Sequence, residues 1–210
     1  MKTAPVVFAA TIDPEDRARA DFYALLARLY HDAPDATVLA AIAKADELTT
    51  EDGGGAAQKL AQTWRALIAA STAMDPEAAA DEYQQLFIGV GKSEVSLHAS
   101  AYQQSMGGST LADIRARLAR LGLGRQSGVN VYEDHLAALC ETMRVLITGS
   151  AELNATELSV QRDFFETHVM PWVFDCCNAI RACPIANYYR RVAELTESFM
   201  AIERDSFAIE

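Results

Sequence analysis

The sequence predicts an all-α protein, a single-domain bundle of roughly nine to eleven helices. Three observations support this prediction. Apolar residues recur three or four positions apart along most of the chain, as they do on one face of a helix. No segment alternates apolar and polar residues long enough to form a convincing strand. Glycines and prolines divide the helices at fairly even intervals, and no linker is long or charged enough to mark a domain boundary.

The composition limits the partners that the protein can have. Half of its 210 residues are apolar, and its formal net charge is −11. This charge argues against nucleic acid as a partner, because phosphate binding needs a concentrated positive surface. It permits a basic or apolar peptide partner. No apolar run approaches the roughly 20 residues that span a bilayer, so we expect no stable membrane insertion.

The N-terminus differs from the rest of the chain. It carries Lys2 and a short apolar stretch at residues 5–10, and acidic residues follow from Asp13. Because the charged start is thin and the acids follow at once, we interpret residues 1–12 as a flexible arm rather than a signal peptide. Residues 13–210 then form the helical domain.

Two helices are predicted before residue 50. Asp13 is an N-cap, and Pro14 follows it at the first helical position, where proline is favoured. Apolar residues recur at helical spacing behind this start. A second helix is predicted from Asp35 to about Glu47, before the glycines at 53–55 break the chain.

Two further helices precede a loop. The third predicted helix carries Trp64 on its apolar face, and Asp75 with Pro76 repeats the start signal for a fourth that ends near Phe87. Residues 88–100 show no apolar stripe at helical spacing and include two glycines, so we predict a loop there.

The second half of the chain contains the remaining predicted helices. The glycine pair at 107–108 ends a short helix, and apolar spacing over 111–121 predicts the next one. Another is predicted over 133–148. A following helix is predicted to end at Pro171, which can itself begin another, and the last helix follows Pro184.

The cysteines are predicted to be free thiols. Three of the four lie in apolar helical segments, as reduced buried thiols do, which fits a cytoplasmic protein. The four are Cys140, Cys176, Cys177 and Cys183. Imidazole and thiolate suit zinc, so a site combining His135 with these thiols is an alternative. Adjacent Cys176 and Cys177 would point about 100° apart on a helix and rarely chelate one ion, so we expect no metal or other cofactor.

No signature of catalysis is present. The chain lacks GxGxxG, a P-loop, GxSxG and HExxH, and its four histidines are scattered. We therefore predict a protein that is not an enzyme. A small helical enzyme or metal protein using His135 with nearby acids or thiols is the alternative.

One candidate site combines an aromatic helix end, a glycine-containing loop and the next helix start. Aromatic faces beside such a loop can form a peptide groove, although the same residues can also serve as core and connector. The residues concerned are Tyr83, Leu86, Phe87, Gly89, Ser100 and Tyr102.

A second candidate site lies before the helix predicted over 133–148. Asn130 and Glu133 have the spacing of a capping box, and Asp134 would complement the helix dipole. The functional interpretation is that Asp134 and His135 project from a helix end and meet a cationic ligand.

Taken together, these motifs resemble the TorD/DmsD-type family of redox-enzyme maturation chaperones. Its members carry an E-Y-x-x-L-F-x-G segment and then an S-x-Y element, matched by Glu82, Tyr83, Leu86, Phe87, Gly89, Ser100 and Tyr102. They also carry a D-H pair at a later helix start, matched by Asp134 and His135. The resemblance spans roughly residue 20 to the C-terminus. The family's usual proline before the S-x-Y element is absent, and Glu133 stands where proline often precedes the D-H pair.

The resemblance implies a cytoplasmic, all-helical chaperone for a molybdenum-cofactor oxidoreductase. Such a chaperone binds the client's twin-arginine signal peptide, its apo form or both, and assists maturation before export. The eight residues implied to bind the peptide are Tyr83, Leu86, Phe87, Gly89, Ser100, Tyr102, Asp134 and His135. An acidic protein with an apolar groove complements a peptide that combines two guanidiniums with an apolar run. A homodimer is also physically open to such a bundle.

Overall fold

The computed structural model describes residues 12–49, 54–89, 91–103, 110–125, 130–150 and 153–209. Within these ranges the only β pairing is a single bridge between His98 and His135, so the predicted all-α class is confirmed. The helices are α1 (Pro14–His31), α2 (Ala36–Ala43), α3 (Gly55–Ala73), α4 (Pro76–Tyr83), α5 (Thr110–Arg120), α6 (Leu136–Thr148), α7 (Leu158–Phe164), α8 (Met170–Ala182) and α9 (Tyr188–Ile209).

Two π-helical turns extend these helices. One, Gln84–Ile88, continues α4, and the other, Phe165–Val169, joins α7 directly to α8. A short 3₁₀ turn at Ala99–Ala101 lies between α4 and α5. Because α7 and α8 form one rod, the described residues contain eight continuous helices, slightly fewer than the predicted nine to eleven.

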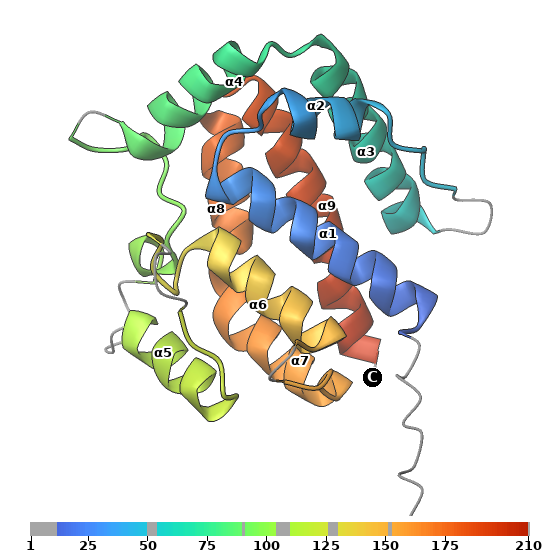
Figure 1. Ribbon diagram of the computed structural model, residues 1–210, viewed down its shortest axis with the longest axis vertical. Coiled ribbons are helices and arrows are strands. Elements are labelled where there is room, and N and C mark those ends of the chain that lie inside the picture. The colour runs from blue at the N-terminus through green and yellow to red at the C-terminus, as the bar shows by residue number, and fades with distance from the viewer. Residues whose placement is uncertain are drawn as a thin grey trace, which may run out of the picture.

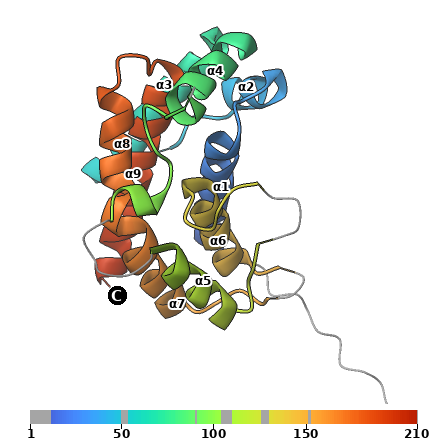
Figure 2. The same ribbon diagram turned by 90° about the vertical axis from the view of Figure 1, so that its left-hand side faces the viewer.

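The helices lie in two layers. In Figure 1, α1 and α6 lie in front of α8 and α9, and Figure 2 shows the same two layers edge-on. The short α2 and α4 and the longer α3 cover one end of the bundle, while α5 lies near the opposite end (Figure 1). Buried side chains from both layers form one continuous hydrophobic core.

Aspartate caps begin three of the helices, and two of these caps, Asp13 and Asp75, were predicted. The carboxylates of Asp13, Asp35 and Asp75 accept backbone N–H groups within the first turns of α1, α2 and α4. These bonds satisfy N–H groups that have no partner inside a helix. The proline signals at Pro14 and Pro76 are confirmed too, since each lies in the first turn of its helix.

Three predicted boundaries were wrong. α2 ends at Ala43 rather than near Glu47, because the chain turns there and the Asp46 carbonyl accepts a hydrogen bond from the Trp64 indole at 2.9 Å. Pro171 begins a helix as predicted, since it lies in the first turn of α8, but the preceding helix does not stop there: α7 continues through the second π-helical turn directly into α8. That turn shifts the backbone hydrogen-bond register just before the proline, so the rod continues.

The third error concerns the start of α6. This helix begins at Leu136, and its N-cap is His135, not Asn130. The predicted capping box with Glu133 does not form, because the backbone before Leu136 is extended and bonded to another segment. Ala99 N–H donates to the Asp134 carbonyl at 2.9 Å, and Leu136 N–H donates to the Leu97 carbonyl at 2.8 Å.

A buried polar network joins α1 to α9 and α7. The Arg19 guanidinium donates to both carboxylate oxygens of Glu203, at 2.8 and 3.0 Å, and to Gln161 at 3.1 Å. Tyr23 donates its hydroxyl to the same carboxylate. Glu203 is only 1% exposed, and its pairing with Arg19 and its hydrogen bonds offset the cost of burying the carboxylate. The network fixes the register of α1 against α9.

The remaining predictions concern membrane insertion, the N-terminal arm and a glycine pair. No described helix is long and apolar enough to cross a membrane. The predicted arm, residues 1–12, lies outside the described residues except for Ile12, as does the glycine pair at 107–108.

Candidate functional site

Glu82 of the E-Y-x-x-L-F-x-G segment is a helix cap. It lies on α4, and its carboxylate accepts the backbone N–H groups of Asn187, Tyr188 and Tyr189 at 2.8, 3.0 and 2.8 Å. These three groups form the N-terminal end of α9, where a negative charge also complements the helix dipole. A buried carboxylate thus joins α4 to a helix more than a hundred residues away in sequence.

The aromatic residues of that segment pack into the core. Tyr83 and Phe87 contact each other edge-to-face with ring centroids 5.2 Å apart, and Phe87 contacts Tyr189 at 4.9 Å. The Tyr83 hydroxyl donates to the last carbonyls of α1, at Tyr30 and His31. Burial raises the pKa of Tyr83 to about 12. Tyr83, Phe87 and the fully buried Leu86 therefore hold α4 against α1 and α9.

Gly89 ends the π-helical turn. Its φ is +65°, and a Cβ at this position would lie 2.2 Å from the Lys92 carbonyl oxygen. Its N–H donates to the Gln84 carbonyl, and Val95 N–H donates back to Leu86. Only glycine fits this combination of positive φ and close backbone approach. The loop after α4 therefore folds back tightly onto the helix.

The two candidate sequence motifs meet at one place, which we call the junction (residues 97–100 and 134–136). Its backbone is joined by the single antiparallel bridge already described. Asp134 is 2% exposed, and its two oxygens accept from His98 Nδ1 at 3.0 Å and from the Ser100 backbone N–H at 3.2 Å. Burial alone would raise the pKa of Asp134, but the hydrogen bonds from His98 and Ser100 outweigh it and lower the pKa to about 2.

His135 lies beside Asp134 but points to different partners. Its Nδ1 accepts the Ala137 N–H at 3.2 Å and caps α6, and its ring lies edge-to-face against His98 at 4.9 Å. Burial, followed by the nearby His98 and His31, lowers its pKa to about 3. His135 is therefore neutral at ordinary pH and accepts a hydrogen bond as a helix cap.

The S-x-Y element gives the more accessible part of the predicted site. The Ser100 side chain is exposed, and Tyr102 is half-buried. Tyr102 stacks on Trp172 at 5.5 Å and donates its hydroxyl to the Ser96 carbonyl at 2.9 Å. The structure thus brings Ser100 together with Asp134 and His135, whereas Tyr83, Leu86 and Phe87 lie in the core between α1 and α9.

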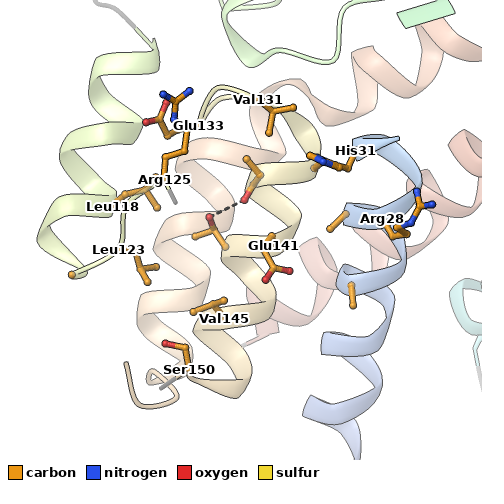
Figure 3. A pocket seen from close by; sticks show the side chains of 17 residues that line it. Arg28, His31, Leu118, Leu123, Arg125, Val131, Glu133, Glu141, Val145 and Ser150 are labelled. Carbon is orange, nitrogen blue, oxygen red and sulfur yellow. Dashed lines mark hydrogen bonds between the residues drawn. The ribbon is translucent and has the colours of Figure 1, made fainter. Parts of the chain in front are cut away.

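An open groove borders the junction. It has a volume of about 790 Å³, and it lies between the second half of α1, the end of α5 and the outer face of α6. Figure 3 shows side chains from the three helices and from the segment after α5 around it, among them Arg28, His31, Leu118, Leu123, Glu141 and Val145. Val131 and Glu133, which precede the junction, complete one end. This volume falls in the range of about 300–1,000 Å³ that is usual for ligand sites.

The groove surface is mostly small and apolar. Ala24 and Ala27 of α1 face it together with Ala137 and Ala138 of α6. Sequence analysis missed these positions, since alanines on two helix faces give no motif. The spacing of three between Ala24 and Ala27 was the one available signal that α1 presents a small-residue face.

The thiols do not gather around His135. Cys140, Cys176 and Cys177 are buried, Cys183 is half-buried, and all four are free. Burial raises the pKa of the Cys176 thiol to about 12 and shifts Cys140 in the same direction. Among the residues that the structure describes, no three His, Cys, Asp or Glu side chains are placed to hold a metal ion.

Comparison with known proteins assigns the chain to a family. A family model described as the nitrate reductase delta subunit matches residues 54–178, more than half of the chain. No curated protein matches the chain significantly. The matched range contains the E-Y-x-x-L-F-x-G segment, the S-x-Y element and the D-H pair. The chain therefore belongs to the nitrate reductase delta subunit family of redox-enzyme maturation chaperones.

Proposed function

We propose that the protein binds the twin-arginine signal peptide of a molybdenum-cofactor oxidoreductase in the groove between α1, α5 and α6. It acts in the cytoplasm and holds the client, by its peptide or its apo form, until maturation is complete. Membership of a chaperone family, not an enzyme family, supports the general role. The observation that carries the site is the apolar groove beside the D-H motif.

The groove matches the two parts of such a peptide. Its alanine-lined surface suits an apolar run, and Glu133 and Glu141 supply negative charge. Burying ~400 Å² of apolar peptide surface contributes ~10 kcal/mol before binding costs, at about 25 cal/mol/Å². A solvent-exposed arginine–carboxylate pair adds only ~0.2–1 kcal/mol. The apolar run therefore supplies most of the affinity, and the carboxylates supply orientation and discrimination.

The eight residues of the predicted site take different parts in this proposal. Tyr83, Leu86, Phe87 and Gly89 fix the fold of α4 and its loop. Asp134 and His135 fix the junction, which carries Glu133 into the groove. The S-x-Y element, Ser100 and Tyr102, is the part of the eight that a bound peptide extending past the junction could touch.

Filling the groove tests the proposal. Ala138 lines it from α6, so Ala138→Trp places an indole where the peptide would lie. Ala69→Trp on the exposed face of α3 is the matched control. The probe is a synthetic peptide with two consecutive arginines ahead of an apolar run, and binding is measured by calorimetry.

We expect the wild-type protein and Ala69→Trp to bind this peptide alike and Ala138→Trp to bind at least about tenfold more weakly, since bulk in the groove removes apolar contact area. Circular dichroism confirms that both variants are folded. Undiminished binding by folded Ala138→Trp would place the peptide elsewhere. No binding by the wild-type protein would contradict the proposed function.

A further inference from the structure

Two carboxylates line the groove at different positions along its length. Glu133 lies just before the junction, and its side chain is 13% exposed. Glu141 lies on α6, five residues after the helix begins, so it is about 7.5 Å further along the helix axis than Leu136. Figure 3 shows Glu133 between α5 and α6 and Glu141 on the outer face of α6. They are spaced along the groove rather than clustered.

Each of these carboxylates already holds an arginine of the chain. Arg115 on α5 donates its Nε to Glu133 at 3.1 Å. Arg144 on α6 donates Nε and Nη2 to the two oxygens of Glu141 at 2.8 and 2.7 Å, the forked geometry that guanidinium and carboxylate favour. Neither arginine lines the groove itself. The groove carboxylates are thus occupied by the same functional group that the proposed peptide carries twice.

The other charged groups around the groove limit which carboxylates can bind an arginine of the peptide. Both oxygens of buried Asp134 are bonded within the junction, so a guest arginine reaches them only if the junction opens. Arg28 and Arg125 also line the groove and bring positive charge to it. A guest guanidinium is therefore favoured only within hydrogen-bond reach of a carboxylate, which leaves Glu133 and Glu141.

We infer that Glu133 and Glu141 each receive one of the paired arginines, and that Arg115 and Arg144 are placeholders which the peptide displaces. This rests on the proposed function. The exchange is balanced, because one arginine–carboxylate pair replaces another. It is also facile, because Arg115 is 48% exposed and Glu141 50% exposed, and such partly exposed pairs stabilise a protein only weakly.

If Arg115 and Arg144 are placeholders, removing either one should strengthen binding of the positively charged peptide. The gain should exceed the gain from removing a positive charge elsewhere on the protein. Arg115→Gln and Arg144→Gln each free a carboxylate, so each should raise affinity for the Arg-Arg peptide about 1.5- to 5-fold. Glu133→Gln and Glu141→Gln should lower it. Glu141→Gln should also reduce the preference for Arg-Arg over a Lys-Lys version, since lysine lacks the fork.

Arg191→Gln is the matched control. Arg191 pairs with Glu194 three residues away on α9 at 2.8 Å, as Arg144 does with Glu141, but outside the groove. It changes the net charge equally and should leave affinity within the small general effect. All variants are compared by calorimetry after circular dichroism has shown that they are folded.

The outcomes separate this inference from the proposed function. Stronger binding by Arg115→Gln and Arg144→Gln than by Arg191→Gln, with weaker binding by both glutamine replacements of glutamate, supports it. Equal gains in all three arginine variants, or full affinity after Glu133→Gln and Glu141→Gln, overturn it while groove binding stands. No binding by the wild-type protein overturns both.

Discussion

Glu82 shows how a motif residue can serve the fold. Its position in the E-Y-x-x-L-F-x-G segment led us to expect a segment that contacts a client, yet its carboxylate holds the start of α9. The three N–H groups that donate hydrogen bonds to it come from a part of the chain far away in sequence. No local pattern could therefore reveal that Glu82 contacts the start of α9. The motif could be recognised from sequence, but the role of its first residue could not.

Replacing Glu82 should destabilise the protein strongly. Glu82→Ala leaves three N–H groups at the start of α9 without their acceptor, at a cost of at least about 3 kcal/mol. For a domain of this size that lowers Tm by roughly 6–12 °C. The neighbouring Asp81 is exposed, so Asp81→Ala should change Tm by little in the same thermal scan. Similar Tm values for the two variants would contradict the capping role.

His135 makes stability depend on pH. Its pKa is lowered to about 3 in the fold, against an ordinary value of 6.5, so below pH 6.5 the unfolded chain binds a proton that the folded chain does not. The stability that neutral His135 provides is therefore fully present above pH 6.5 and is lost as pH falls toward 3. Protonation would also convert the Nδ1 acceptor that caps α6 into a donor.

A neutral cap should remove this dependence. Asparagine is a favoured N-cap and does not titrate, so His135→Asn keeps the cap without the ionisation. Between pH 6 and 5 the free energy of unfolding, from urea titrations, should fall about 1 kcal/mol more in the wild-type protein than in His135→Asn. Parallel slopes for the two proteins would show that His135 does not bring about the loss.

Among the elements, the helix starts that aspartate marks were predicted correctly, whereas the end of α2 and the start of α6 were not. Asp13, Asp35 and Asp75 act within their own first turns, so the sequence contains the whole signal. The start of α6 depends on the bridge between His98 and His135, and the end of α2 lies beside the hydrogen bond from Trp64 to Asp46. Such long-range determinants leave no local pattern.

Replacing Gly89 tests whether the loop that follows α4 is as tight as the structure shows. Gly122 also has a positive φ, +73°, but a Cβ there meets nothing within 4 Å, so Gly122→Ala carries only the backbone cost of about 1–2 kcal/mol. Gly89→Ala adds a clash with the Lys92 carbonyl and should destabilise the protein by about 3 kcal/mol or more. Urea unfolding measures both. Equal losses would mean that the loop shifts freely to accept the methyl group.

For the molecule as a whole, fold class and family could be predicted from the sequence, whereas the groove could not. The class follows from periodicity, which every helix carries locally. The groove is assembled from α1, α5 and α6, and only folding brings Ala27, Leu118 and Ala138 together. The junction, where the two predicted motifs meet, lies beside this groove, while most of the motifs' side chains lie in the core.

Mapping a bound peptide by photo-crosslinking tests the central claim, that the groove receives the twin-arginine peptide, most directly. A photoreactive phenylalanine analogue in the apolar run of the synthetic peptide is irradiated in the complex, and mass spectrometry locates the attachment points. Groove binding predicts attachment within residues 24–31, 118–125 and 137–145, the ranges of α1, of the end of α5 with the segment after it, and of α6 that contain most of the groove lining. Excess unlabelled peptide should abolish it. Attachment that excess unlabelled peptide abolishes but that is confined to α3 or α9 would contradict the account.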